Sequence, residues 1–222
     1  MPEPIRNRPK GHGKRALLWT AIIRQSLIAI AFFKIVRVTV VNQQAVPRRG
    51  AVIVASNHIS MLDGIFLWGA LRRRAVAMAM AELWKWPIVG WMVRQLGFIP
   101  VLRGSHSSGK ASGIAALDVL SHQGVLIIYP EGRCVSPGDT APYKGGVAAL
   151  SLRTGAPIVP VGIVGSNRLM PLARDRVGRR RFYSRQRVRL EFGQPIDPAQ
   201  YDSVSTLLER VSADVKALSS AL

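Results

Sequence analysis

Apolar runs and amphipathic stretches alternate along this chain from residue 36 onward. Continuous apolar runs are typical of strands buried on both faces of a sheet, and alternating apolar and polar residues of strands buried on one face. These patterns predict strands at 36–40, 51–56, 125–129, 158–164 and 188–192. Apolar residues at helical spacing predict helices at about 62–73, 107–122, 144–154 and 203–219. Strands alternating with helices predict an α/β fold, a single domain with a mixed, largely parallel sheet flanked by helices.

The first 35 residues differ in character from the rest. Residues 1–15 are basic and contain proline and glycine, so we expect a flexible arm. Residues 16–33 are apolar, but Arg24 lies near their middle, where a charge inside a bilayer would be costly. We therefore expect a helix lying in the membrane interface, with a buried core helix as the alternative. The expected division is a basic arm with an interface helix at 1–35 and a globular domain at 36–222.

The charge of the chain narrows the choice of partner. There are 31 Lys and Arg against 12 Asp and Glu, a net charge of +19. Such an excess favours an anionic partner, either nucleic acid or an anionic membrane surface. No zinc pattern or RNA-binding aromatic motif accompanies the charge, so we expect no nucleic-acid partner. The arginine-rich segment from Arg168 to Arg189 is instead a candidate contact for anionic lipid.

One short stretch brings together the side chains that general-base chemistry requires. Asn57-His58-Ile59-Ser60-Met61-Leu62-Asp63 follows a predicted buried strand. A histidine can accept a proton near neutral pH, and a carboxylate on its other ring nitrogen fixes the tautomer. Because residues five apart do not share a face of a helix, His58 must precede the helix and Asp63 must lie in its first turn. The alternative is structural: Ser60 and Asp63 form a capping box, S-x-x-D, at the start of the helix.

This stretch resembles the NHxxxxD motif of the glycerolipid acyltransferases, the family of 1-acylglycerol-3-phosphate acyltransferases. Three further blocks of that family have counterparts here in the same order: Gly97-Phe98-Ile99-Pro100-Val101-Leu102-Arg103, Tyr129-Pro130-Glu131-Gly132 and Val159-Pro160-Val161-Gly162. The resemblance covers roughly residues 35 to 195. It implies that His58 is the catalytic base, that Asp63 orients it, and that the acyltransferase domain occupies residues 36–222.

The resemblance also implies a set of substrate-binding residues. Arg103 is expected to hold the acceptor phosphate, with Glu131 and Gly132 at the acceptor site; Asn57 and Lys144 are further candidates for substrate contact. The third block usually reads FPEGTRS, and this chain departs from it, because Arg133 takes the threonine position and Cys134 the arginine position. We expect Arg133 to supply the displaced charge.

Cys134 is the single cysteine of the chain, which excludes an intrachain disulfide and multi-cysteine metal sites. We expect it to be a packing residue, with a covalent acyl-enzyme as the alternative.

The sequence as a whole predicts a membrane-associated O-acyltransferase. It would move a fatty acyl group from acyl-CoA or acyl carrier protein to a lysophospholipid hydroxyl, with 1-acylglycerol 3-phosphate giving phosphatidic acid. We expect no metal and no cofactor beyond the thioester co-substrate. The expected location is the cell membrane, peripheral or monotopic on its cytoplasmic face. The alternatives are an acyltransferase for glycerol 3-phosphate or another lysolipid, and a non-catalytic basic membrane-binding protein on the same fold.

Overall fold

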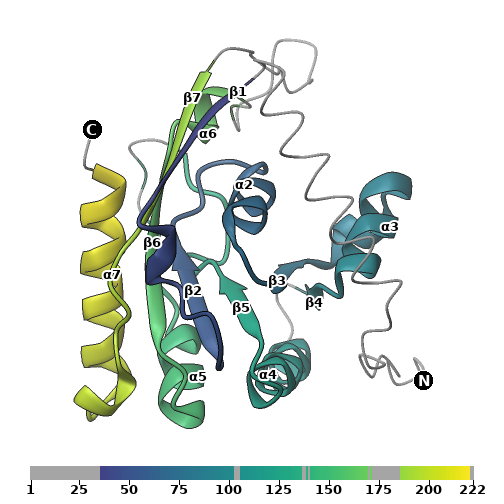
Figure 1. Cartoon of the computed structure of the whole chain (residues 1–222). Helices are drawn as coiled ribbons and strands as arrows, with labels where there is room; N and C mark the ends of the chain where they lie inside the picture. The colour runs from purple at the N-terminus through teal and green to yellow at the C-terminus, as the bar shows by residue number, and fades with distance from the viewer. Residues whose placement is uncertain are drawn as a thin grey trace, which may run out of the picture.

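A seven-stranded sheet forms the centre of the protein (Figure 1). The computed structural model describes residues 36–102, 106–136, 139, 141–169, 171 and 186–220. The strands are β1 (Val36–Val41), β2 (Val52–Ser56), β3 (Ala75–Met80), β4 (Ile99–Val101), β5 (Val125–Ile128), β6 (Ile158–Val164) and β7 (Gln186–Phe192). The helices are α2 (Asp63–Ala70), α3 (Pro87–Leu96), α4 (His106–Ser121), α5 (Gly146–Thr154), α6 (Ser166–Leu169) and α7 (Val204–Ser220). Short 3₁₀ turns lie at Gln43–Ala45, Ala81–Lys85 and Pro198–Gln200.

The strands lie in the order β1-β7-β6-β2-β5-β3-β4. Every neighbouring pair is parallel except β6 and β7, which run antiparallel. The first and last strands of the chain, β1 and β7, therefore run parallel to each other and opposite to the other five. The predicted single α/β domain with a mixed, largely parallel sheet is confirmed.

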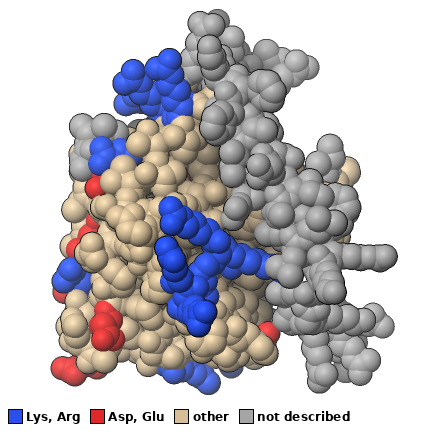
Figure 2. Space-filling view, in the orientation of Figure 1, with Lys and Arg blue, Asp and Glu red and all other residues tan. Residues whose placement is uncertain are grey.

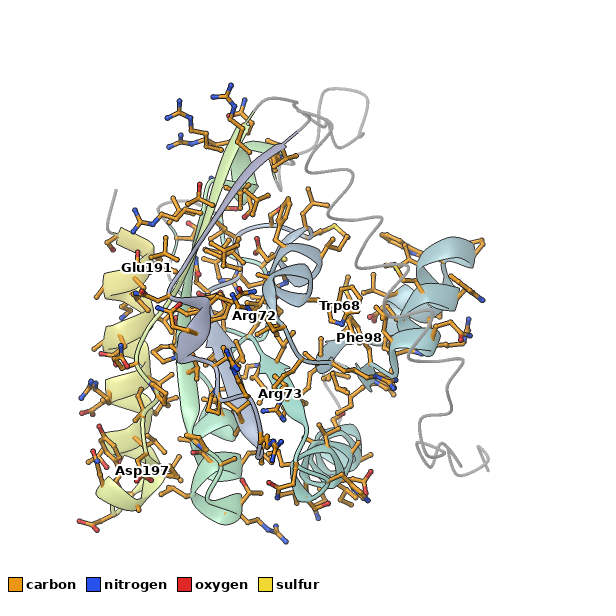
Figure 3. The ribbon with its side chains drawn as sticks, in the orientation of Figure 1. Trp68, Arg72, Arg73, Phe98, Glu191 and Asp197 are labelled. Carbon is orange, nitrogen blue, oxygen red and sulfur yellow. The ribbon has the colours of Figure 1, made fainter. Side chains whose placement is uncertain are left out.

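The two faces of the sheet bury separate apolar clusters. Val52 and Val54 of β2 lie in one cluster with Trp68 of α2, while Ile53 and Ala55 lie in the other. Phe98 packs against the first cluster and is labelled with Trp68 in Figure 3. Helices α4, α5 and α7 contribute to the second cluster and line one side of the sheet in Figure 1. β2 is buried along its whole length, as its continuous apolar run predicted.

The sequence pattern did not predict three of the elements. Strand β3 is built of alanine, valine and methionine, and β4 has only three residues with a central proline, so neither carries a strong strand signal. Helix α3 begins with Pro87 at its first turn and ends at Gly97 in the left-handed conformation. A proline in the first turn and a glycine after the last turn are usual at the ends of helices. The tryptophans and methionines in and around this segment obscured the helical spacing of its apolar residues.

Helix α2 ends at Ala70, earlier than the predicted residue 73. The reason is tertiary: the Arg73 guanidinium donates hydrogen bonds to the carbonyls of Pro47, Gly50 and Gln123 at distances of 2.7–2.8 Å. These bonds fasten the chain to the amino-terminal edge of the sheet, and Figure 3 shows Arg73 there beside Arg72.

The expected interface helix at 16–33 lies outside the described residues. Within the part of the chain that the structure describes, no helix has both the length and the apolar character needed to cross a bilayer.

Candidate active site

Three parallel strands end at the same rim of the sheet, and the candidate site lies there. His58 follows β2, the Tyr129–Glu131 segment follows β5, and Ser166 follows β6. In open α/β sheets ligands bind beyond the carboxyl ends of the strands. The first two of these segments follow strands that the sequence predicted, and the parallel strand directions place them on one rim.

His58 and Asp63 are in direct contact. His58 Nδ1 lies 2.9 Å from Asp63 Oδ2. His58 sits in the turn before α2, and Asp63 is the first residue of the helix. The Asp63 side chain is completely buried, and that of His58 is 18% exposed. Because the carboxylate accepts from Nδ1–H, the neutral ring presents the lone pair of Nε2 outward.

The Asp63 carboxylate is held by three further donors. Its Oδ2 accepts hydrogen bonds from the backbone N–H groups of Ile59 and Ser60, at 2.7 and 2.8 Å. Its Oδ1 accepts one from Ser166 Oγ at 2.5 Å. A carboxylate fixed on both oxygens cannot rotate away from the imidazole. The orientation of His58 is therefore set by Ser166, the first residue of α6, as well as by its own turn.

The capping box proposed for Ser60 and Asp63 is only half formed. The Asp63 carboxylate does reach back to the Ser60 N–H, as a capping box requires. Ser60 Oγ, however, accepts from the Leu62 N–H at 3.3 Å, and α2 begins at Asp63. The prediction that Ser60 caps the third residue of the helix is wrong, because the helix starts later than expected.

The loop after β5 contacts His58 at three points. Glu131 Oε2 accepts the His58 backbone N–H at 2.9 Å, and the Val135 N–H donates to the His58 carbonyl at 2.7 Å. Between these contacts, Cys134 Sγ lies 3.0 Å from His58 Nε2. The loop therefore fixes the backbone of His58 on both sides and places a thiol at its outward ring nitrogen.

These contacts change the proton affinity of His58. Burial lowers its pKa, but hydrogen bonds with Asp63 and Cys134 and the charges of both outweigh burial and raise the pKa from 6.5 to about 9. The imidazolium is thus favoured at neutral pH in the free protein. Only the neutral form of the ring can act as a base, and a neutral ring with this high proton affinity is a strong acceptor for a proton held at Nε2.

Tyr129 stacks on the imidazole. The ring centroids are 4.2 Å apart, with an angle of 20° between the planes. Its hydroxyl is buried and has no hydrogen-bond partner among the described residues. Burial, followed by the charge of Asp63, raises the pKa of Tyr129 well above its ordinary value. The stacked ring gives His58 an apolar wall.

The side chain of Asn57 forms hydrogen bonds with the backbone of β6. Its Nδ2 donates to the Ile163 carbonyl at 2.8 Å, and its Oδ1 accepts the Ile163 N–H at 2.7 Å. The side chain is buried, and both of its polar atoms are occupied. These bonds join the end of β2 to β6, and substrate contact by Asn57 stays a prediction, because its amide keeps a second N–H and its oxygen a second lone pair.

The other predicted binding residues gather only in part. Gly132 has a φ of +66°, which favours glycine, and a Cβ placed on it would lie 2.7 Å from Lys144 Nζ. Lys144 therefore lies over the Glu131–Gly132 turn. Arg133 is exposed on the same turn, and burial raises the pKa of Glu131. Arg103 lies outside the described residues.

Sequence reasoning missed Ser166 and Tyr129 as partners of the dyad. Ser166 lies just beyond Gly165 at the carboxyl end of the buried strand β6, and a small polar residue in that place is a usable signal. Tyr129 stands where the resembling motif has phenylalanine, so an aromatic contact was available to infer. The proximity of Cys134 to His58 has no comparable signal.

Comparisons with known proteins identify the family of this chain. The acyltransferase family model matches residues 37–164, more than half of the chain. The chain is 29% identical over 132 residues to a 1-acyl-sn-glycerol-3-phosphate acyltransferase of Borreliella burgdorferi, covering 60% of this chain and 53% of that protein. It is 30% identical over 152 residues to the human 1-acyl-sn-glycerol-3-phosphate acyltransferase beta, covering 68% and 54%.

A third relative has a different acceptor in its name. The lyso-ornithine lipid O-acyltransferase of Pseudomonas aeruginosa is 33% identical over 118 residues, covering 53% of this chain and 44% of that protein. The chain thus spans about half the length of these curated relatives.

A solved structure shares the fold. The crystal structure of PlsC, the 1-acyl-sn-glycerophosphate (LPA) acyltransferase of Thermotoga maritima, matches with a TM-score of 0.77 at 24% identity. The match covers 94% of this chain and 81% of that one. The family match spans the turn of His58 and Asp63, the loop of Cys134 and the whole of β6. This chain belongs to the acyltransferase family.

Proposed function

We propose that this protein transfers a fatty acyl group from a thioester, acyl-CoA or acyl carrier protein, to the free hydroxyl of a lysophospholipid. The proposed acceptor is 1-acylglycerol 3-phosphate, and the product is phosphatidic acid. The observation that carries the proposal is the imidazole of His58, fixed by Asp63 at the strand rim of a chain in the acyltransferase family. Two of the relatives described above are named for this acceptor.

In the proposed reaction His58 accepts the proton of the acceptor hydroxyl at Nε2. The hydroxyl oxygen attacks the thioester carbonyl, and the thiol carrier leaves with a proton. Asp63 keeps Nδ1 protonated and stabilises the imidazolium that forms. The donors on both oxygens of Asp63 hold this orientation without relying on the substrate.

The acceptor phosphate is assigned to the basic residues around the third block. Lys144 lies over the Glu131–Gly132 turn and Arg133 projects from it, so two cations flank the loop that holds His58. Guanidinium groups suit phosphate because they can form paired hydrogen bonds. We retain Arg103 in this role from its position in the second block. Asn57 supports the site indirectly through Ile163.

We assign catalysis to residues 36–222 and membrane contact to residues 1–35 and the Arg168–Arg189 segment. A lysophospholipid acceptor resides in a bilayer, so the enzyme would work at an anionic membrane surface on the cytoplasmic face, where acyl-CoA and acyl carrier protein are supplied. The net charge of +19 favours this surface.

The test is an assay of the purified full chain with labelled acyl-CoA and acyl carrier protein donors against a panel of lyso-acceptors. We expect transfer to 1-acylglycerol 3-phosphate. His58→Ala should lose roughly 10²–10⁴ in rate because it removes the general base. His122→Ala is the matched control, since this histidine lies 78% exposed at the end of α4. Normal turnover by folded His58→Ala protein, or no transfer by the wild type to any acceptor, would refute the proposal.

A second acceptor class is favoured by one observation. The Pseudomonas aeruginosa relative acts, by its name, on a lyso-ornithine lipid. An ornithine headgroup carries a carboxylate and an amine in place of a phosphate, and a guanidinium can pair with either anion. The same panel therefore includes lyso-ornithine lipid and glycerol 3-phosphate. A preference for lyso-ornithine lipid would support the same acyl transfer with this lipid, and not 1-acylglycerol 3-phosphate, as the acceptor.

A further inference from the structure

Three exposed arginines lie at the amino-terminal edge of the sheet, at the opposite end of the strands from His58. Arg48 and Arg49 precede β2, and Arg72 precedes β3; both strands run parallel to β5, which lies between them. Figure 2 shows basic side chains gathered in the middle of this face, where Figure 3 labels Arg72 and Arg73. Uncharged surface separates them from the basic side chains at the top of the view. We call the three exposed arginines the arginine patch.

Hydrogen bonds fasten together the two loops that carry the arginine patch. The Arg73 guanidinium donates to the carbonyls of Pro47 and Gly50, on either side of the two arginines of the first loop. Arg72 Nε donates to Gln43 Oε1 at 2.8 Å. The patch is therefore a preformed surface, and a partner that binds it does not have to order the loops first.

The charge of the arginine patch is not balanced within the part of the chain that the structure describes. The ion pairs found there are His58–Asp63, His122–Asp118, Arg189–Glu191 and Arg210–Asp214. None of them includes an arginine of the patch. Like charges on one small surface repel one another, and a surface of opposite charge relieves that repulsion. The chemistry of the patch therefore favours an anionic partner.

The position of the arginine patch favours a protein over a bilayer. In the proposed function the lysophospholipid enters from the bilayer at the rim that carries His58. The five residues of β2 separate this rim from the patch by roughly 17 Å, at about 3.3 Å per residue. This separation exceeds the screening length of about 10 Å at 0.1 M salt. A bilayer at the rim therefore has little attraction for the patch.

The surroundings of the arginine patch favour an acidic protein over coenzyme A, whose phosphates are also anionic. The adenine ring of coenzyme A needs an aromatic or apolar surface on which to stack. The groups that contact Arg72 and Arg73 are the Gln43 side chain and backbone carbonyls, which provide no such surface. Three cations spread over two loops instead suit an extended acidic surface.

We propose that the arginine patch is the docking surface for an acidic acyl carrier protein that delivers the thioester. This inference rests on the proposed acyltransferase function, and it names the partner that binds outside the site of His58. A carrier protein holds its acyl group on an extended phosphopantetheine arm, so its docked surface lies apart from the reacting carbonyl. The patch and His58 are separated in the same way. The patch takes no part in the transfer of the acyl group itself.

The experiment compares two triple variants of the full chain that change the net charge equally. The patch variant is R48E/R49E/R72E. The control is K110E/R153E/K216E, which reverses three exposed cations on α4, α5 and α7. Transfer from palmitoyl-acyl carrier protein and from palmitoyl-CoA is measured, and fluorescence anisotropy measures binding of labelled carrier protein.

The patch variant should lose about 10- to 100-fold, relative to the control, in kcat/KM and in affinity for the carrier protein at 0.1 M salt. The two variants should turn over palmitoyl-CoA equally, because the patch does not contact this donor. The difference with carrier protein should shrink at 1 M salt, where the charges are screened. Thermal melts establish that both variants are folded, and R49E alone gives the same comparison if the triple variant unfolds.

The outcomes separate this inference from the proposed function. Equal losses with both donors, a greater loss with palmitoyl-CoA, or unchanged binding of carrier protein would each overturn the docking surface. Transfer from palmitoyl-CoA alone, without binding of carrier protein, would overturn the docking surface and leave the proposed function standing. A wild-type protein that binds carrier protein through the patch but acylates no acceptor would support the docking surface and refute the proposed function.

Discussion

Both the ring and the backbone of His58 are held by contacts with other residues. Its ring contacts Asp63, Cys134 and Tyr129, and its backbone contacts Glu131 and Val135. Two of these partners stabilise the charged ring against the effect of burial. The residue therefore contributes to the stability of the folded protein in a pH-dependent way.

The direction of this dependence follows from the raised pKa. The pKa of His58 is about 9 in the folded protein and 6.5 in the reference state. Its contribution should be fully present below pH 6.5 and be lost as the pH rises through 9, because between these values only the folded state binds the proton. We expect the stability difference between wild type and His58→Gln to shrink by up to about 1.4 kcal/mol per pH unit.

Urea unfolding of both proteins at several pH values across this window measures the difference. Comparing the two proteins cancels the titration of the other histidines. A difference that stays constant, or that grows with pH, would show that Asp63 and Cys134 do not favour the imidazolium in the folded state.

The site was predictable from the sequence where its partners are close along the chain. His58 and Asp63 are five residues apart and meet because a turn precedes α2. Cys134 is 76 residues from His58, and Ser166 is 103 from Asp63. Those contacts depend on how far each loop extends beyond its strand, which local pattern does not encode. The bonds of Asn57 to Ile163 could not be predicted for the same reason, since Ile163 lies on another strand.

At the scale of elements, β6 and α7 approach more closely than side chains would allow. A Cβ placed on Gly162 of β6 would lie 2.4 Å from the backbone carbon of Leu218 in α7. The glycine lets the helix backbone rest directly on the strand. Since β6 also carries Ile163, which holds Asn57, this contact supports the geometry of the site.

Gly162→Ala should therefore displace α7 and lower the free energy of unfolding by about 3 kcal/mol, the upper range for overpacking. Gly69→Ala is the control, because nothing lies within 4 Å of a Cβ at that position of α2. It should raise stability by up to about 1 kcal/mol through helix propensity. Thermal or urea unfolding measures both variants, and equal effects would contradict the close packing of β6 and α7.

The fold was predictable where strands are long, apolar and bounded by clear turns. The run predicted at 158–164 coincides with β6, and the last helix was placed to within one residue at each end. The sequence did not predict strand β3, because alanine and methionine have little preference for strands. The strand forms through pairing with β5 and β4. Pairing of this kind is a tertiary effect and leaves no period in the sequence.

At the scale of the whole molecule, basic residues collect near the rim that carries the site. Because β1 and β7 run opposite to β6, they begin at the rim where β6 ends. Arg37 and Arg187 face each other across this pair and are both exposed, and Arg168 is exposed on α6. Figure 2 shows basic side chains at this end of the molecule. Adjacent like charges are unfavourable unless an anion lies between or beside them.

This arrangement predicts how the protein binds lipid. Deletion of residues 1–35, which ends just before β1, should strongly weaken sedimentation with vesicles that contain phosphatidylglycerol. The residual binding should vanish between about 0.1 M and 1 M salt, since the screening length falls from about 10 to 3 Å. Neutral phosphatidylcholine vesicles are the control. Undiminished, salt-resistant binding by the shortened protein would contradict the interface helix.

The pairing of β1 with β7 also has a consequence for synthesis on the ribosome. Val36 pairs with Gln186, about 150 residues later in the chain. At about 5–20 residues per second, β1 emerges roughly 8–30 s before its partner strand is made. The central strands can pair with one another in that interval, whereas β1 has no partner strand and its apolar residues stay exposed to solvent. We therefore expect nascent chains stopped before residue 186 to retain an unpaired β1 and to bind chaperones, and the last strand to complete the sheet.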